Sequence, residues 1–351
     1  MTRQETEPKT LGSLHLSRYA TLNFDGSLIS SILPPMPVKA DLRAAQFRAC
    51  ADPAKKFAIA KCIVQAKLAR SLQVLDWLAQ RYDIEKELRL AKKETAQLGQ
   101  GRTVADLRSV EGHVATKYWR AYAKVLPEHL DFHGRMTTSH QNNASDPVNL
   151  ALNYGYGFLE GECRSAINAV GLEPSAGFLH EFSARQTRQS LVYDLEEPFR
   201  WLIDTSVLEA FESGILDLQN FYFTGDDYRY RFDVEAKSRF VEVLRERFNS
   251  GVRYGGQVVK WDTIIEQKAE ELGKCLIGNI CSIDFSEPSP NLSRPDSMKV
   301  RRGILSLTQT EAGKLGIGKS TLHYLRKNAK SAGSFAIRRK ISEKLGQLDT
   351  G

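Results

Sequence analysis

The chain has 351 residues, 42% of them apolar, which is enough for roughly two or three domains with a substantial core. No stretch approaches about 20 uninterrupted apolar residues, so no transmembrane helix is expected. The polar start, MTRQETEPKT, is unlike a secretory signal. Five cysteines without a CxxC pair favour buried thiols in a reducing cytoplasm over disulfides or a zinc site.

The formal net charge of +7 is unevenly distributed along the chain. Residues 284–351 hold 13 Lys and Arg against 6 Asp and Glu, while the preceding 283 residues hold 36 of each. A basic segment appended to a neutral body is typical of a module that binds a polyanion. The alternative is that this charge serves solubility alone.

The N-terminal part of the chain predicts a β-hairpin. Residues 15–33 (HLSRYATLNFDGSLISSIL) place β-branched and aromatic residues on both sides of an Asp25-Gly26 turn signal. A single hairpin is marginally stable, so it is expected to pack on another part of the protein. The proline-punctuated segment 34–40 (PPMPVKA) predicts a linker.

From Asp41 onward the sequence predicts long helices, and therefore a mainly α protein. Asp52 is placed to cap a helix that begins at Pro53, and apolar residues follow at three- and four-residue spacings as far as Leu78. Helical patterns continue over 84–126 and 149–171, separated by a polar loop at 133–147. Gly155-Tyr156-Gly157 lies inside one of these patterns, which argues against a nucleotide-cradling loop there.

The C-terminal part predicts a linker followed by a helix-turn-helix module. Residues 284–300 (DFSEPSPNLSRPDSMKV) carry three prolines and four serines and no apolar periodicity. A short helix over 308–315, a turn at Gly316-Ile317-Gly318 and a second helix then follow. In this arrangement the early residues of the second helix reach base edges or phosphates. The candidate nucleic-acid-binding residues are Lys319, Ser320, Thr321, His323, Tyr324 and Arg326. The alternative is an ordinary helical hairpin packed on the body.

Four polar residues are candidates for a metal-dependent catalytic site. His180, Asp194 and Glu197 lie within GFLHEFSARQTRQSLVYDLEEPFR (177–200), where Asp194 and Glu197 share one helical face and Pro198 suggests a kink. Glu111 lies on the apolar and aromatic side of another helix, where an unpaired acid would be costly. Carboxylates with one imidazole suit Mg²⁺ or Mn²⁺. Taken singly, however, each of these residues is more often structural than a ligand.

The sequence supports only general expectations about the roles of the residues next to these candidates. Glu196 is expected at the surface, beside Glu197. Three arginines of the same stretch are candidates either for phosphate contacts or for pairing with its acids: Arg185, Arg188 and Arg200.

Several segments, in the same order, resemble the CRISPR-associated integrase–endonuclease family of spacer acquisition. They are VEGHVATKYW, DPVNLALNYGYGFL, GLEPSAGFLHEFSARQTRQSLVYDLEEPFRWLID and WDTIIEQKAEEL, and the resemblance runs from about Arg18 to Ile280. It implies a helical catalytic domain in which a Glu, a His and a downstream acid bind Mg²⁺ or Mn²⁺. Those positions match Glu111, His180 and Glu197, with Asp194 as the accompanying acid.

The resemblance also implies a reaction and partners. A DNA 3′-hydroxyl attacks a phosphodiester of a CRISPR repeat, which inserts a short DNA fragment (a spacer). The reverse reaction also occurs, and some members cut DNA. The implied partners are double-stranded DNA, as spacer precursor and as repeat, a second copy of the chain and the small adaptation partner protein. No membrane is involved, and the expected location is the cytoplasm.

Two departures from the family pattern shape the expected domain organisation. Residues 1–38 correspond only to the last strands of the family's N-terminal β domain, and a basic helix-turn-helix module, as in archaeal members, follows the catalytic domain. We therefore expect a β remnant (1–38), a helical catalytic domain (39–283), a linker (284–300) and the DNA-binding module (301–351).

Two alternative functions stay open at this point. A casposon transposase, or another stand-alone integrase, would use the same chemistry on mobile DNA. A non-catalytic helix-turn-helix DNA-binding protein would keep the fold as a regulator. The unbroken set of Glu111, His180 and Glu197 argues against the second of these.

Overall fold

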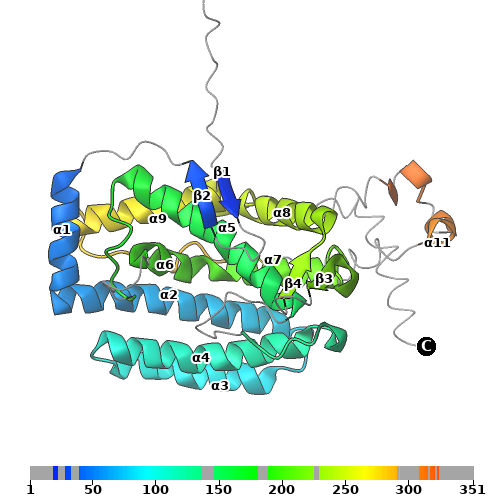
Figure 1. Cartoon of the computed structure of the whole chain (residues 1–351). Coiled ribbons are helices and arrows are strands. Elements are labelled where there is room, and N and C mark those ends of the chain that lie inside the picture. The colour runs from blue at the N-terminus through cyan, green and yellow to red at the C-terminus, as the bar shows by residue number, and fades with distance from the viewer. Residues whose placement is uncertain are drawn as a thin grey trace, which may run out of the picture.

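Helices form the body of the protein, as the sequence predicts (Figure 1). The computed structural model describes residues 19–22, 28–32, 39–135, 146–180, 189–224, 229–290, 292, 308–314, 317–320 and 322–323. The α-helices are α1 (Ala40–Ala51), α2 (Pro53–Ala79), α3 (Glu85–Thr95), α4 (Val104–Val125), α5 (Pro147–Val170), α6 (Ser190–Glu196), α7 (Arg200–Glu212), α8 (Val234–Phe248), α9 (Trp261–Leu276) and α11 (Gln309–Lys314). Four 3₁₀ turns accompany them: η1 (Ala96–Gln100), η2 (Glu128–Leu130), η3 (Glu197–Phe199) and η4 (Leu218–Asn220).

The long helix α2 lies between two groups of helices, with α3 and α4 on one side and α5 to α7 on the other (Figure 1). It begins where the sequence predicts, because the Asp52 side chain accepts hydrogen bonds from the backbone N–H groups of Ala54 and Lys55. Its predicted apolar stripe is buried, and Ile63, Val64 and Leu75 are at most 1% exposed. Burial of each such side chain contributes about 1.5–3 kcal/mol.

Helix α5 packs against α6, α7 and α9 and is buried along most of its length. The Asp146 side chain caps its start, and Gly171 ends it with a left-handed φ of 88°. Gly155 lies inside the helix, as expected. It faces α7 at such close range that no side chain fits there. A Cβ atom there would come within 2.4 Å of Ile203 Cγ2.

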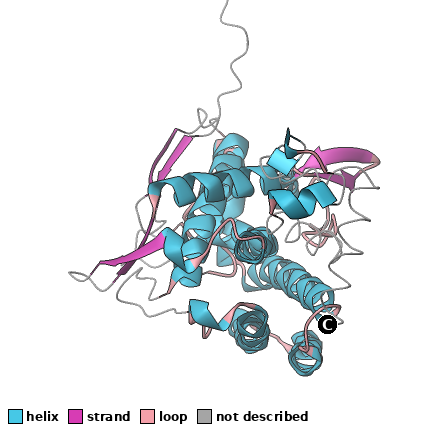
Figure 2. Cartoon of the chain, turned by 90° about the vertical axis from the view of Figure 1, so that its right-hand side faces the viewer, coloured by secondary structure: helices cyan, strands magenta, loops and turns pink. Residues whose placement is uncertain are grey.

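Three antiparallel hairpins lie at the outside of the helical body (Figure 2). They pair β1 (Tyr19–Leu22) with β2 (Leu28–Ile32), β3 (Phe221–Thr224) with β4 (Arg229–Phe232), and β5 (Gly251–Tyr254) with β6 (Gln257–Lys260). The first is the hairpin predicted at residues 15–33, and both of its strands pack on α5. Its turn, with Asp25 and Gly26, lies outside the described residues.

The described part of the expected linker, residues 284–290 and 292, packs on the helical body. Phe285 is 2% exposed within the core, and Leu292 packs against the core. The guanidinium of Arg70, on α2, donates to the backbone carbonyls of Ser286 and Pro288. This part of the chain is therefore anchored beside α2.

The described part of the C-terminal segment comprises α11 and a few residues beyond it. Ala312, Ile317 and Leu322 are buried, and the N–H of Ile317 donates to the carbonyl of Ala312 over 2.9 Å. Among the predicted DNA-binding residues, Lys319, Ser320 and His323 are exposed. The other three, Thr321, Tyr324 and Arg326, lie outside the described residues, so the helix-turn-helix stays a prediction.

None of the helices within the described ranges has the length and apolar character needed to cross a membrane.

Candidate active site

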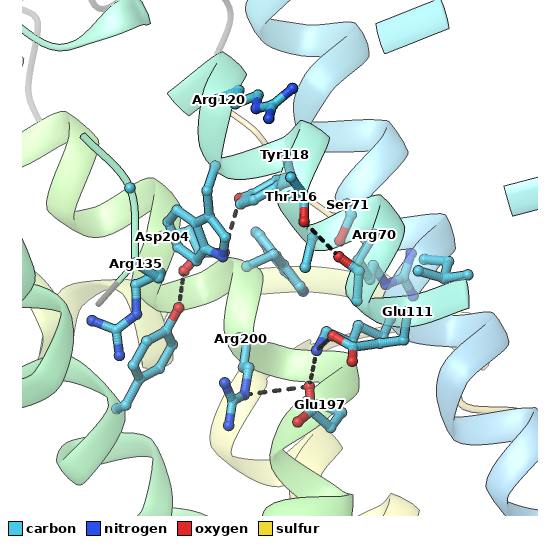
Figure 3. Close-up of a pocket in the computed structure, with 18 of the residues that line it drawn as sticks. Arg70, Ser71, Glu111, Thr116, Tyr118, Arg120, Arg135, Glu197, Arg200 and Asp204 are labelled. Carbon is cyan, nitrogen blue, oxygen red and sulfur yellow. Dashed lines mark hydrogen bonds and ion pairs between the residues drawn. The ribbon is translucent and has the colours of Figure 1, made fainter. Parts of the chain in front are cut away.

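A pocket of about 540 Å³ opens between α2, α4, α5, η3 and α7 (Figure 3). One side, which we call the acidic end, is formed by Lys67, Glu111 and Glu197. The opposite side, the aromatic end, is formed by Trp119, Arg135, Tyr156 and Asp204. Arg200 lies between the two and faces Glu197 (Figure 3).

Glu197 reaches the pocket because the helix changes its winding at Pro198. Helix α6 ends at Glu196 and continues into the 3₁₀ turn η3, which is the kink that the proline predicts. Glu197 is 4% exposed, and its Oε2 lies 3.4 Å from Arg200 Nε. The chain thus places a nearly buried carboxylate between an arginine and the cavity.

The prediction that Glu196 is a surface residue is wrong. Its side chain is 2% exposed, and Oε2 lies 3.6 Å from Nη2 of Arg200. The 3₁₀ turn brings Arg200 next to both consecutive glutamates. Burial holds the pKa of Glu196 well above its ordinary value, against the lowering effect of Arg200. Arg200 therefore pairs with acids of its own stretch, which is one of the two roles expected for it.

Lys67 links the two carboxylates at the acidic end. It projects from α2, and its ammonium contacts Oε1 of Glu111 on α4 and lies 2.6 Å from Oε2 of Glu197 on η3. Burial by itself would lower the pKa of Lys67, but the carboxylates of Glu197 and Glu111 outweigh it, so the pKa is raised. Burial also opposes ionisation of Glu197, yet Arg200, Lys67 and His180 lower the pKa of Glu197 to about 2. Lys67 and Glu197 are therefore both charged at neutral pH.

His180 is oriented by Asp194 from behind. Nδ1 of the ring lies 2.8 Å from Oδ1 of Asp194. A carboxylate only accepts hydrogen bonds, so this contact places a proton on Nδ1, and Nε2 is the ring nitrogen that remains to act as a ligand. Nε2 faces Oε1 of Glu197 over 3.8 Å.

Asp194 also fixes the backbone that carries His180. The residue is fully buried, and its carboxylate accepts hydrogen bonds from the backbone N–H groups of Phe178 (2.5 Å), Leu179 (3.0 Å) and His180 (2.9 Å). Gly177 makes this approach possible, since a Cβ there would lie 2.9 Å from Oδ2 of Asp194. Asp194 thus points at the loop, whereas Glu197 points at the pocket.

The donor set fits a hard divalent cation. Two carboxylates from separate elements converge on one cationic atom, the ammonium of Lys67, and an imidazole nitrogen faces one of them. Carboxylate oxygens with one imidazole match the preferences of Mg²⁺ and Mn²⁺. As the side chains stand, no three His, Cys, Asp or Glu residues within the described ranges are arranged to hold a metal ion. The cation between the two glutamates is Lys67.

The aromatic end is organised by Asp204, which is 5% exposed. Its two carboxylate oxygens accept hydrogen bonds from the hydroxyls of Tyr118 (2.8 Å) and Tyr156 (2.5 Å). The guanidinium of Arg135 lies 5.1 Å from the centre of the Tyr156 ring, and that of Arg200 lies 5.0 Å from it. Burial raises the pKa of Asp204 to about 6, although both tyrosine hydroxyls lower it.

Sequence reasoning missed two of these residues. Lys67 has the appearance of an ordinary surface lysine, but it lies three residues after Val64 and four after Ile63, both fully buried. A lysine on the buried stripe of a helix was the available signal. Asp204, inside the apolar helix α7, carried a similar signal, because a buried acid needs partners.

Comparison with known proteins gives a consistent result. Residues 16–246 match the family model described as CRISPR associated protein Cas1. The CRISPR-associated endonuclease Cas1 3 of Thermus thermophilus is 32% identical over 244 residues, which is 69% of this chain and 70% of that protein. The CRISPR-associated endonuclease Cas1 of Methanopyrus kandleri is 34% identical over 236 residues, or 65% of this chain and 68% of that protein.

Solved structures extend the comparison to the fold. A structure described as "Casposase bound to integration product" has 33% sequence identity and a TM-score of 0.73, covering 82% of this chain and 79% of that chain. A Cas1 protein from Thermotoga maritima, with 20% identity and a TM-score of 0.59, shares the fold over 73% of this chain and 78% of that chain. The mainly α fold predicted from the sequence is confirmed. Because the family model matches more than half of the chain, the chain belongs to the Cas1 family of CRISPR-associated proteins.

Proposed function

We propose that this chain is a metal-dependent DNA endonuclease and integrase that joins the 3′-hydroxyl end of a short DNA fragment to a phosphodiester of a CRISPR repeat. The observation that carries the proposal is the convergence of Glu111 and Glu197 on one cationic atom, beside His180. Several relatives carry the name CRISPR-associated endonuclease, which supports the same class of enzyme.

In this proposal Glu111, Glu197 and Nε2 of His180 hold Mg²⁺ or Mn²⁺. Such an ion, when bound, polarises the phosphodiester and stabilises the attacking or leaving oxygen. Asp194 is a positioning residue, because it fixes both the ring of His180 and the backbone beneath it. Arg200 positions the carboxylate of Glu197. The joining needs no covalent intermediate with the protein: the 3′-hydroxyl oxygen attacks the phosphorus in line, the bond from phosphorus to the 3′-oxygen of the repeat strand breaks, and that oxygen leaves as a new 3′-hydroxyl.

The basic side chains along the pocket suit a DNA backbone. The cavity wall includes Lys67, Arg70, Arg120, Arg135 and Arg200. Cations placed along a cavity wall neutralise phosphates and orient the strand, and they carry no sequence information. This lining supports double-stranded DNA as the substrate class, both as the incoming fragment and as the repeat.

We further propose that the C-terminal module, over 301–351, binds DNA through a helix-turn-helix, and that 284–300 connects it to the catalytic domain at 39–283. Lys319, Ser320 and His323 are exposed, while Ala312, Ile317 and Leu322 are buried, which supports a folded unit with a polar face. Thr321, Tyr324 and Arg326 complete the proposed contact set. Deletion of residues 300–351 should weaken DNA binding and flatten its salt dependence. Unchanged binding across a salt titration would remove the proposal.

The proposed partners of the chain are a second copy of itself and the small adaptation protein. A complex described as "Cas6-RT-Cas1--Cas2 complex" contains a chain of the same fold, with 20% identity and a TM-score of 0.65, and its name includes such a partner. Residues 1–38 are proposed to correspond to the last strands of the family's N-terminal β domain.

A casposase-type integrase is the second candidate, and the structure described as "Casposase bound to integration product" favours it through its 33% identity. The two functions use the same chemistry and differ in what the enzyme needs. If DNA is joined at the border of a repeat array only when the small partner protein is added, the enzyme acts in adaptation. Joining of a donor duplex without any partner would indicate a stand-alone integrase.

The central test uses Mn²⁺, a supercoiled plasmid and a labelled short duplex with 3′-hydroxyl ends. Wild type should nick the plasmid and join the label to it. His180→Ala, Glu197→Ala and Glu111→Ala should each lose about a thousandfold or more, since a metal supplies several kcal/mol of transition-state stabilisation and each tenfold is about 1.4 kcal/mol. Lys124→Met, which removes the partner of Glu87 at 2.8 Å, is the matched control and should keep wild-type activity. If wild type is no better than the three site variants, the catalytic proposal is wrong.

A further inference from the structure

We propose that Lys67 is a displaceable internal cation, which neutralises Glu111 and Glu197 in the metal-free enzyme and leaves when a divalent metal binds. The inference rests on the proposed metal site and gives Lys67, one of the cations of the cavity wall, a role before DNA is bound. Its basis is the placement of one ammonium between two carboxylates that come from different elements.

The first step of the argument is electrostatic. The side chains of Glu111 and Glu197 are 24% and 4% exposed, so water only partly screens them from each other. Two carboxylates held close together in such surroundings repel unless a cation lies between them. Lys67, with a side chain 16% exposed, supplies that cation. The site is therefore stable as folded, before any metal enters.

The second step is steric. The ammonium contacts Oε1 of Glu111 and lies 2.6 Å from Oε2 of Glu197, so it uses an oxygen of each proposed ligand. A metal ion held by the same two oxygens would take the position that the ammonium now occupies. Two cations cannot share that space, and their like charges repel. Metal binding through these two oxygens and the Lys67 contacts are therefore mutually exclusive.

The third step concerns where the side chain goes. Lys67 lines a pocket of about 540 Å³, together with Ser71 on the next turn of α2 and Thr116 on α4. A lysine has four rotatable methylene groups, so its ammonium can swing into this space while α2 stays in place. In that position it faces the cavity that takes the DNA phosphates in the proposed function. Metal entry thus converts an internal counter-ion into a phosphate contact.

The test measures metal affinity with the full-length protein after treatment with a chelator. Mn²⁺ is titrated, and free Mn²⁺ is followed by electron paramagnetic resonance. Lys67→Met removes the competing charge with little change in length and should bind Mn²⁺ about tenfold or more tightly than wild type, a difference of about 1.4 kcal/mol. Lys67→Arg keeps the charge and should stay close to wild type. Lys124→Met, the control for loss of a lysine paired with a glutamate, should be unchanged.

The outcomes separate the two proposals. If wild type and Lys67→Met bind Mn²⁺ equally, or the variant binds it more weakly, the displacement inference is wrong and the metal site stands. If neither protein binds Mn²⁺, and Glu197→Ala changes nothing, the proposed metal site itself is wrong.

A second measurement uses wild type and so does not depend on the folding of a variant. Lysine acylation by a succinimidyl ester is quantified by mass spectrometry with and without saturating Mn²⁺. Lys67 should become several-fold more reactive with Mn²⁺, because its ammonium leaves the two carboxylates. Lys92, exposed and paired with Asp76 over 2.8 Å, is the internal reference. Equal labelling of Lys67 in both conditions would contradict displacement.

Discussion

Two buried aspartates organise the two sides of the candidate site in different ways. Asp194 accepts hydrogen bonds from three consecutive backbone N–H groups and from the ring of His180. Asp204 accepts from two tyrosine hydroxyls, which come from α4 and α5. The first contact set fixes a loop and the second fixes aromatic rings. A carboxylate bound to the backbone determines the path of the chain, whereas one bound to side chains determines only how those side chains lie.

Removal of each carboxylate tests this difference between the two aspartates most directly. Asp194→Ala leaves three backbone donors that cannot turn away and should lower the free energy of unfolding by about 3–5 kcal/mol. Asp204→Ala should cost less, because the hydroxyls of Tyr118 and Tyr156 can rotate toward other acceptors. Urea denaturation of both variants measures the difference, with Asp194→Asn as the milder control. An equal loss, or a larger one for Asp204→Ala, would contradict the distinction.

The pH dependence of stability should report Asp204 specifically. Burial raises its pKa from 3.8 to about 6. The hydrogen bonds from Tyr156 and Tyr118 and the charges of Arg200 and Arg135 oppose this rise. Between these values the folded state keeps a proton that the unfolded state has lost, so the free energy of unfolding falls as pH rises. The fall should reach about 2 kcal/mol between pH 4 and 6, out of about 3 kcal/mol over the whole transition from below pH 3 to above pH 7.

Asp204→Asn isolates this contribution. The variant should lack the decrease, so the difference between the two stability curves should change by about 2 kcal/mol over the interval and be flat above about pH 7. Parallel curves would show that Asp204 titrates normally.

The smallest expected effect tests how closely the loop approaches Asp194. In Gly177→Ala the added Cβ would lie 2.8 Å from the backbone carbon and Cβ of Ser190. Such overpacking costs about 1–3 kcal/mol. Gly112, within α4, has nothing within 4 Å of the corresponding position, so Gly112→Ala should stabilise the helix by about 0.5–1 kcal/mol. Opposite signs in thermal unfolding are expected, and the same sign for both would contradict the close approach.

The helices were predictable from the sequence because their signals are local. Asp52 caps α2 as its position before Pro53 predicts, and the apolar stripe that follows is buried. The first hairpin was predictable for the same reason, since β-branched and aromatic residues flank a turn signal. Family membership followed from several motifs in order, and the matches to Cas1 proteins confirm it.

The contacts between distant segments were not predictable in this way. Glu196 and Glu197 are adjacent acids before a proline, and only the turn to 3₁₀ geometry buries both beside Arg200. Lys67 precedes Glu111 by 44 residues, and nothing in either local pattern pairs them. The roles of Glu111, His180, Asp194 and Glu197 stay predictions, although the structure brings these residues into one neighbourhood.

The contact of Arg70 with Ser286 and Pro288 limits how far the C-terminal segment can lie from the helical body. The chain stays on the catalytic body as far as Leu292, and the described C-terminal residues resume at Thr308, 16 positions later. Sixteen residues span at most about 55 Å when fully extended. In the proposed function, a duplex held at the start of the C-terminal module would thus begin within about 16 base pairs of Leu292, at about 3.4 Å per base pair. The contacts of Arg70 with Ser286 and Pro288 hold the chain on the helical body just before the segment whose length sets this limit.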